Sequence, residues 1–282
     1  MKNFKFTPYP FSQSQVAERI AQYSQQTLQF FDEQTALRFM LNCIDLTTLE
    51  GSDNTSKIED LCNKAKSYKS VSKKISNPAS VCVYPPFVAQ AKKMLHGSGV
   101  RVASVAGAFP SGQSPLFVKL AEVKYAVDEG ADDIDMVISR GKFLESNYEE
   151  VSEEIVAIKK VCHNTLLKVI IETGELKSFD NIYNASRLAI DAGADFIKTS
   201  TGKVPVNATP ESFLVMIDTI KEYYDHTGIM IGMKPAGGIS DAETALLYLK
   251  ILENVLGEKW LTNHYFRIGA SRLADKIYER IL

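Results

Sequence analysis

The stretch DEGADDID at residues 128–135 recurs, with substitutions, as DAGADFIK at residues 191–198. Each copy combines the end of a predicted helix, a Gly-Ala-Asp turn and the start of an apolar strand. The copies lie two strand–helix units apart, so both strands are predicted to enter one sheet in the same register. In a closed barrel, alternate strands contribute side chains to the same interior layer. Asp135 and Lys198 are equivalent in the two copies, and we expect this carboxylate and this amine to share a layer.

Outward from this repeat, short apolar runs alternate with amphipathic stretches. The runs are continuous, which is typical of parallel strands buried on both faces. The predicted strands are Phe39–Thr47, Ser80–Tyr84, Val100–Ala106, Asp133–Ile138, Leu166–Glu172, Phe196–Ser200, Met230–Pro235 and Tyr265–Gly269. The predicted helices lie near residues 57–69, 86–97, 115–129, 147–163, 177–191, 210–225, 241–256 and 271–281.

Eight strand–helix units in this order indicate an α/β protein of the (β/α)8 class, a TIM barrel. An open doubly wound sheet is the alternative, but no GxGxxG fingerprint follows the first strand. We expect residues 37–282 to form a single barrel catalytic domain. Residues 1–36 are polar and rich in glutamine, with an amphipathic stretch around Val16 and Ile20. They predict an N-terminal helical extension that packs on the barrel.

Four sites carry signals for the start of a helix. Ser56 and Ser240 each precede a glutamate by three residues, the spacing of a capping box. Ser114 and Thr209 each precede a proline, which is favoured at the first position of a helix. We therefore expect these four hydroxyl side chains to cap helices.

The composition limits the classes of partner. The net charge is −2, from 32 basic and 34 acidic residues, so no general attraction to nucleic acid or to a membrane surface is expected. No apolar run approaches the roughly 20 residues of a membrane helix, and the first residues do not resemble a signal peptide.

The histidines lack metal-binding spacings, and no metal site is predicted. The cysteines form no CxxC pair and predict reduced, buried thiols in a cytoplasmic protein: Cys43, Cys62, Cys82 and Cys162.

Charged residues interrupt five of the predicted strands. They are Asp45, Asp135, Lys168, Lys198 and Lys234. Lysine and aspartate are rarely buried unless they are paired or functional. The carboxyl ends of barrel strands carry the catalytic residues, and several of these charges fall late in their strands. The alternative interpretation is a set of salt bridges that closes the barrel without chemistry.

Two lysines on neighbouring strands suit a particular chemistry. An amine attacks a carbonyl only when uncharged, and burial or a second cation lowers its pKa. One of Lys198 and Lys234 can therefore form a Schiff base while the other depresses its pKa. An aspartate in the same layer can act as general acid and base. These parts suit cleavage or formation of a carbon–carbon bond through an enamine.

Glycine-rich turns follow the last strands and predict an anion site. Residues 199–203, 235–238 and 269–271 place glycines and hydroxyls ahead of predicted helices. Backbone N–H groups at helix N-termini favour anions, and barrel enzymes often hold phosphate after strands seven and eight. Ordinary strand-to-helix turns are the alternative.

Over residues 40–280 the chain resembles the deoxyribose-phosphate aldolase family. The matching segments are DLTTL at 45–49, VCVYP at 81–85, KVIIETGEL at 168–176, DFIKTSTGK at 195–203, KPAGG at 234–238 and RIGAS at 267–271. The resemblance implies a class I aldolase that reversibly cleaves 2-deoxy-D-ribose 5-phosphate to acetaldehyde and D-glyceraldehyde 3-phosphate. It implies no metal and no organic cofactor, and barrels of this kind commonly pair as homodimers.

The resemblance also implies roles for individual residues. Lys198 matches the Schiff-base lysine, Lys234 the lysine that lowers its pKa, and Asp135 the aspartate that relays protons. Lys168 matches a lysine that supports Asp135 and a substrate hydroxyl. The positions that match the binding sites for the sugar and the phosphate are Asp45, Cys82, Thr199, Thr201, Gly202, Lys203, Gly237, Gly238, Gly269 and Ser271.

Two residues depart from the family pattern near the expected phosphate. Ser240 stands where members often carry arginine, and Arg272 where many carry serine or threonine. We hypothesise that Arg272 restores the missing charge. Two other functions stay open at this point: an aldolase of the same mechanism with another aldehyde donor, and a silent barrel that binds a sugar phosphate or a protein.

Overall fold

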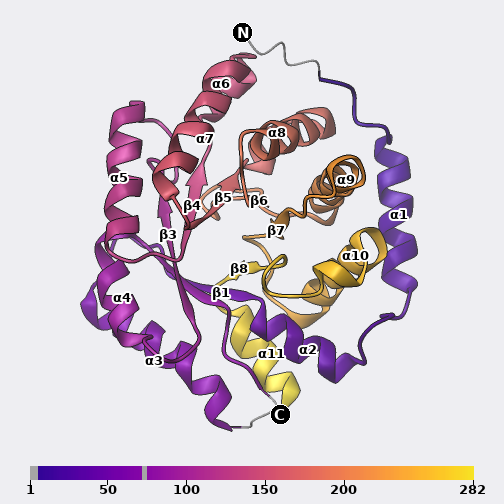
Figure 1. Cartoon of the computed structure of the whole chain (residues 1–282). Helices are drawn as coiled ribbons and strands as arrows, with labels where there is room; N and C mark the ends of the chain where they lie inside the picture. The colour runs from indigo at the N-terminus through magenta and orange to yellow at the C-terminus, as the bar shows by residue number, and fades with distance from the viewer. Residues whose placement is uncertain (1–5, 72–74) are drawn as a thin grey trace.

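The computed structural model describes residues 6–71 and 75–282, and Figure 1 shows its parallel sheet at the centre of a ring of helices. The sheet has eight strands in the order β7-β6-β5-β4-β3-β2-β1-β8. Backbone bridges between Met233 and Phe266, and between Ala236 and Gly269, join its two ends. The fold is therefore a (β/α)8 barrel, as predicted. The strands are β1 (Ile44–Thr47), β2 (Ser80–Val83), β3 (Arg101–Ala106), β4 (Asp133–Val137), β5 (Leu166–Ile170), β6 (Phe196–Lys198), β7 (Gly232–Lys234) and β8 (Ile268–Ala270).

The helices cover the outside of the barrel (Figure 1). They are α1 (Gln13–Gln25), α2 (Glu33–Asn42), α3 (Thr55–Val71), α4 (Val88–Met94), α5 (Leu116–Asp128), α6 (Arg140–Leu144), α7 (Tyr148–Cys162), α8 (Phe179–Asp191), α9 (Pro210–Thr227), α10 (Ala242–Leu256) and α11 (Leu273–Ile281). Short 3-10 turns are η1 (Pro85–Phe87), η2 (Thr173–Glu175) and η3 (Glu258–Trp260). Strand side chains that point outward pack under these helices in one continuous apolar core, so both faces of the sheet are buried.

The first predicted strand begins too early, because Phe39–Asn42 belongs to α2. The Asp32 side chain accepts a hydrogen bond from the Thr35 N–H at 2.7 Å and caps this helix. A buried helix then runs directly into a buried strand, and a single apolar run does not distinguish the two. Strands β5 and β6 end two residues earlier than predicted, and β8 begins three residues later than the predicted Tyr265.

The capping predictions are confirmed at one site of four. Thr209 caps α9 in a reciprocal capping box with Ser212. At α10 the cap is Asp241 instead of Ser240, because the carboxylate accepts from the Thr244 N–H at 2.7 Å. The predictions at Ser56 and Ser114 are also wrong. Helix α3 already begins at Thr55, and the residue that caps α5 is the proline that follows Ser114.

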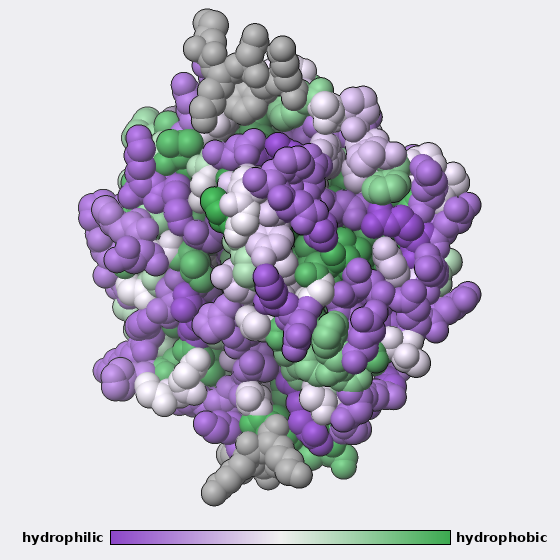
Figure 2. All heavy atoms as spheres, turned by 45° about the vertical axis from the view of Figure 1, so that its right-hand side comes forward, coloured by the Kyte–Doolittle hydropathy of each residue, from purple (hydrophilic) through white to green (hydrophobic). Residues whose placement is uncertain are grey.

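The amphipathic stretch near the N-terminus forms α1, which packs against α9 and α10. Arg19 binds both carboxylate oxygens of Asp218 on α9, at 2.6 and 2.7 Å, and the Tyr9 hydroxyl donates to the same carboxylate. Figure 2, turned so that the α1 side comes forward, shows a mainly hydrophilic face with small separate hydrophobic groups.

The boundary expected after residue 36 falls inside α2, and residues 1–5 of the expected extension lie outside the described residues.

The cysteines are unpaired and buried, as predicted. In residues 6–71 and 75–282, no helix is long and apolar enough to cross a membrane. The same residues contain no group of three or more His, Cys, Asp or Glu side chains arranged to hold a metal ion.

Candidate active site

The five charged strand residues singled out in the sequence point into the barrel. Strand register sets Asp135 on β4 beside Lys168 on β5, and Lys198 on β6 beside Lys234 on β7. Because side chains alternate along a strand, each of these residues can present its charged group to the interior. All four are buried, and Lys198 keeps 3% of its surface exposed.

The Asp135 carboxylate joins the three lysines. Its Oδ2 atom accepts hydrogen bonds from Lys198 Nζ and from Lys234 Nζ, both at 2.7 Å. Its Oδ1 atom accepts from Lys168 Nζ at 3.2 Å. The shared layer that the 128–135 and 191–198 repeat predicts is confirmed, since the Asp135 and Lys198 side chains are in direct contact.

Two more buried carboxylates, those of Asp45 and Asp133, lie nearer the amino-terminal ends of the strands than Asp135. Asp45 Oδ2 forms an ion pair with Lys234 Nζ at 2.5 Å, and Asp45 Oδ1 accepts from Arg267 Nη1 at 2.7 Å. Asp133 Oδ2 accepts from Lys168 Nζ at 2.7 Å. Sequence reasoning missed Asp133 and Arg267 as members of this cluster. Asp133 lies two residues before Asp135 and so faces the same side of β4, which is a signal that could have revealed it.

The buried cluster holds one more basic group than acidic ones. Three carboxylates face three lysines and one arginine: Asp45, Asp133, Asp135, Lys168, Lys198, Lys234 and Arg267. An unbalanced charge is costly in a buried site. The partly exposed Arg101 also pairs with Asp133 at 2.5 Å, so basic groups are in excess, and loss of a proton from one lysine reduces that excess.

The pKa shifts single out the lysine that can lose this proton. Burial lowers the pKa of Lys198, and the Lys234 ammonium lowers it further, while the Asp135 carboxylate opposes both. Burial also acts to lower the pKa of Lys234, but the carboxylates of Asp135 and Asp45 outweigh it and raise that pKa. The three lysines hold the pKa of Asp135 well below its usual range against the effect of burial. Of these two neighbouring lysines, Lys198 is therefore the one that loses its proton more readily.

Lys198 borders a cavity of about 580 Å³ at the carboxyl ends of the strands. The turns that the sequence assigned to anion binding line the same cavity. Its lining includes these predicted residues: Lys198, Thr201, Gly202, Lys203, Gly237, Gly238, Gly269 and Ser271. Lys57, Ser240 and Arg272 also line it. The basic groups at this end give the cavity a positive side.

The cations around the cavity are held by ion pairs with nearby acids. Lys203 Nζ lies 2.9 Å from Glu50 Oε1, and Lys57 Nζ lies 2.5 Å from Asp53 Oδ1. Gly237 has a φ of 78°, and a Cβ atom there would lie 2.7 Å from the side chain of Asn207. Only glycine fits this turn, because the Asn207 side chain packs against it.

Three predicted binding residues, like the predicted catalytic residues Asp135, Lys168 and Lys234, do not line the cavity. Asp45 and Cys82 are completely buried, and burial raises the pKa of the Cys82 thiol. Thr199 is also buried, and its hydroxyl accepts from the Ala236 N–H at 2.9 Å and donates to the Ala236 carbonyl at 3.2 Å. The Thr199 hydroxyl therefore links the turns after β6 and β7, and these two hydrogen bonds use both its donor and an acceptor position.

A closed barrel with an activated lysine at its mouth defines an α/β-barrel enzyme that acts on carbonyl compounds. The model of the DeoC/LacD family aldolase matches residues 39–251. The deoxyribose-phosphate aldolase of Homo sapiens is 44% identical over 248 residues, covering 84% of this chain and 78% of the relative. That of Bos taurus is 43% identical over 251 residues, with coverage of 86% and 79%. The chain therefore belongs to the DeoC/LacD family of aldolases.

A solved structure supports the same assignment. The tetrameric deoxyribose phosphate aldolase from Aeropyrum pernix is 25% identical to this chain, with a TM-score of 0.72. The similarity covers 93% of this chain and 97% of that one. The fold therefore extends over nearly the whole length of both chains.

Proposed function

We propose that this aldolase reversibly cleaves 2-deoxy-D-ribose 5-phosphate to acetaldehyde and D-glyceraldehyde 3-phosphate. The observation that carries the proposal is the single Asp135 oxygen that binds both Lys198 Nζ and Lys234 Nζ at 2.7 Å. Burial and the neighbouring Lys234 ammonium lower the pKa of the Lys198 amine beside the cavity, and the shared carboxylate lies within reach of that amine. The names of the relatives supply the substrate, and the cationic side of the cavity suits its phosphate.

In the proposed reaction, the uncharged Lys198 amine attacks the C1 aldehyde of the open-chain sugar. Loss of water gives a protonated imine, which withdraws electrons from the C2–C3 bond. That bond breaks as the C3 hydroxyl loses its proton, and glyceraldehyde 3-phosphate leaves. The electron pair remains on C2 as an enamine. Protonation of C2 and hydrolysis of the imine release acetaldehyde and restore the amine.

The neighbouring groups have separate proposed roles. Lys234 stays charged and keeps the pKa of Lys198 low. Asp135 moves protons to and from the carbinolamine and the C3 hydroxyl. Lys168 holds Asp135 in place through its 3.2 Å hydrogen bond and approaches a substrate hydroxyl. Asp45 and Cys82 shape the inner wall on the sugar side.

The phosphate is proposed to bind at the turns that line the cavity. Helix α11 begins just after one of these turns without a side-chain cap, so its N-terminus favours an anion there. The proposed binding residues on this side are Thr199, Thr201, Gly202, Lys203, Gly237, Gly238, Gly269 and Ser271. All except Thr199 border the cavity directly.

Borohydride reduction in the presence of acetaldehyde tests the mechanism. We expect a stable adduct on the peptide that contains Lys198, and none in Lys198→Ala. Lys159→Ala is the matched control, because Lys159 is partly buried but pairs with Asp195 outside the barrel. Absence of an adduct in the wild type would exclude the Schiff base. Equal turnover of 2-deoxyribose with and without its phosphate would contradict the substrate assignment.

The assembly, the domain division and the location are part of the same proposal. A homodimer is supported by the oligomeric state named for the Aeropyrum pernix relative, which is itself a multiple of two. Residues 1–36 are proposed to act as an extension that covers α9 and α10, supported by the Arg19–Asp218 ion pair. Buried, unpaired thiols support a cytoplasmic location.

A further inference from the structure

The segment of residues 199–209 connects β6 to α9 and has two sides. Thr201, Gly202 and Lys203 border the cavity of about 580 Å³. The opposite side of the segment rests on residues 172–174, which follow β5. The contacts that hold this segment therefore also fix the positions of Thr201, Gly202 and Lys203, which face the phosphate end of the proposed substrate.

Glu172 is the central residue of this support. Its side chain is completely buried, and its backbone is left-handed, with φ 57° and ψ 64°. Residues other than glycine, asparagine and aspartate rarely adopt this conformation. Such strain persists where the surrounding structure imposes it, often at functional sites. The proposed chemistry assigns no role to this residue, although it ends the strand that carries Lys168.

The Glu172 carboxylate is bound by Thr201. The Thr201 N–H donates to Oε1 at 3.1 Å, and the Thr201 hydroxyl donates to Oε2 at 2.6 Å. Arg140 lies farther away, 3.9 Å from Oε2, and makes its close contact, at 2.5 Å, with Glu175. Burial raises the pKa of Glu172, and the hydrogen bonds from Thr201 oppose that shift. The carboxylate thus depends on two donors from one residue of the segment.

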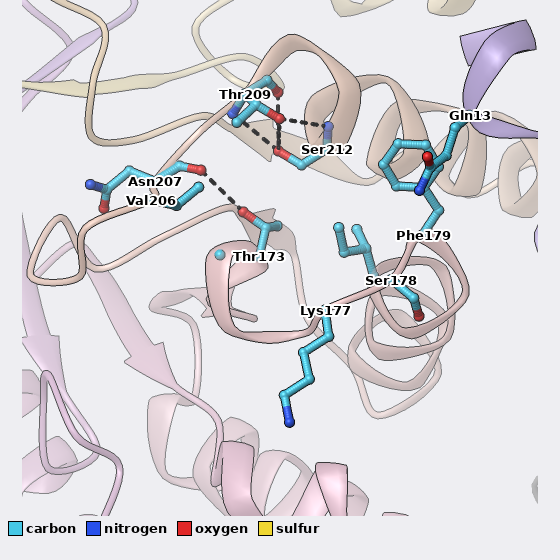
Figure 3. Close-up of a pocket in the computed structure, with 11 residues that line it drawn as sticks. Gln13, Thr173, Lys177, Ser178, Phe179, Val206, Asn207, Thr209 and Ser212 are labelled. Atoms are coloured by element: carbon cyan, nitrogen blue, oxygen red, sulfur yellow. Dashed lines mark hydrogen bonds between the residues drawn. The ribbon is translucent and has the colours of Figure 1, made fainter. Parts of the chain in front are cut away.

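The next two residues hold the rest of the segment. The Thr173 N–H donates to the Thr199 carbonyl at 2.9 Å, and the Thr173 hydroxyl donates to the Asn207 carbonyl at 3.4 Å. Figure 3 shows Thr173 facing Asn207 and Val206 at the edge of a smaller cavity. At Gly174 a Cβ atom would lie 2.0 Å from the Val206 carbonyl oxygen. Both ends of the segment are therefore fixed to the end of β5.

We infer that Glu172 is a positioning residue that sets the preference for phosphorylated over unphosphorylated substrate, an inference that rests on the proposed function. By holding Thr201, whose hydroxyl also accepts from the Lys203 N–H at 3.1 Å, it keeps the Gly202 backbone and the Lys203 side chain at the anion side of the cavity. Lys198 does not depend on this support, because its strand pairs with β5 and β7 on either side. Loss of the support therefore weakens phosphate binding and leaves the reacting amine in place.

The test compares Glu172→Gln with Glu175→Gln, a matched control three residues away that contacts Arg140 but not Thr201. The glutamine amide replaces one acceptor oxygen by an NH2 donor and removes the negative charge, so a single neutral oxygen is left for both Thr201 donors. We expect the KM for 2-deoxyribose 5-phosphate to rise about tenfold or more in Glu172→Gln, the effect of one charge-assisted hydrogen bond. The acetaldehyde adduct on Lys198 should still form, and Glu175→Gln should keep the wild-type ratio of kcat/KM between the two sugars.

Thr201 provides a second test that leaves the buried carboxylate in place. Thr201→Val removes the hydroxyl donor that binds Glu172 and should lower the ratio as Glu172→Gln does. An unchanged ratio in both Glu172→Gln and Thr201→Val, or an equal loss for both sugars, would overturn the inference. A wild-type enzyme that forms no adduct, or shows no preference for the phosphate, would instead overturn the proposed function.

Discussion

Replacing Lys234 with leucine should raise the pKa of Lys198. Both ammonium nitrogens donate to the same Asp135 oxygen at 2.7 Å, so they lie within twice that distance of each other. At an effective dielectric constant of about 20, two unit charges about 5 Å apart repel by about 3 kcal/mol. This energy corresponds to a pKa change of about 2 units. The Asp135 carboxylate also loses a competing partner, which acts in the same direction.

The expected loss of rate follows from the fraction of uncharged amine. The neutral form attacks the carbonyl, so activity falls as the pH drops through the pKa of Lys198. A pKa raised by about 2 units lowers the neutral fraction about 100-fold at any pH below the original pKa. In Lys234→Leu we therefore expect kcat/KM near neutral pH to fall about 100-fold. It should recover at higher pH, with the acid limb of the profile displaced upward.

The assay is kcat/KM for 2-deoxyribose 5-phosphate between about pH 5 and pH 10, with the rate of borohydride trapping measured in parallel. Removing one partner of a buried ion pair typically destabilises a protein by about 3–5 kcal/mol, so thermal melting must show that the variant is folded. Lys159→Leu, which removes an amine outside the barrel, should leave the acid limb unmoved. A folded Lys234→Leu enzyme with the wild-type acid limb would refute the role assigned to Lys234.

Three further predictions concern other parts of the molecule. Asp135→Asn should lower turnover about 10²- to 10⁴-fold and slow the formation of the adduct on Lys198, because the carbinolamine loses its proton relay; unchanged turnover and trapping rates would contradict this role. Arg272→Ala should raise the KM for the phosphorylated substrate about tenfold, and an unchanged KM would dismiss Arg272 as a phosphate ligand. Tyr9→Phe removes a hydrogen bond to Asp218 and should lower the free energy of unfolding by about 1 kcal/mol without changing kcat, as thermal melts and steady-state rates would show. A change in kcat would mean that the N-terminal segment reaches the active site.

The sequence predicts those parts of the fold and the site that depend on local pattern. The 128–135 and 191–198 repeat predicts the contact between Asp135 and Lys198, since equal register and a period of two bring both side chains inward. The choice of Lys198 over Lys234 as the nucleophile came from the family resemblance. The coordinates add a physical reason, the lower pKa of Lys198, but its role stays a prediction until trapping is done.

Features that depend on tertiary contacts escaped prediction. The ion pair of Asp45 with Arg267 forms because the first and last strands meet, and nothing local to either residue signals it. Asp241 caps α10 although Ser240 beside it offers the same chemistry, and the backbone path decides between them. Glu172 ends an apolar run and looks like a continuation of the strand. Its left-handed backbone has no sequence signal, since glycine, the usual residue there, is absent.

Barrel closure has a consequence for when the buried ion pairs are completed during synthesis. Asp45 and Arg267 belong to opposite ends of the chain, and β1 pairs with β8 only after residues 268–270 have been made. At about 5–20 residues per second, the ribosome finishes this last strand about 11–45 seconds after it finishes the first one. Before then, Asp45 lacks Arg267 and the first strand lacks its neighbour β8. The network of buried ion pairs inside the barrel is therefore completed only when β8 closes the sheet.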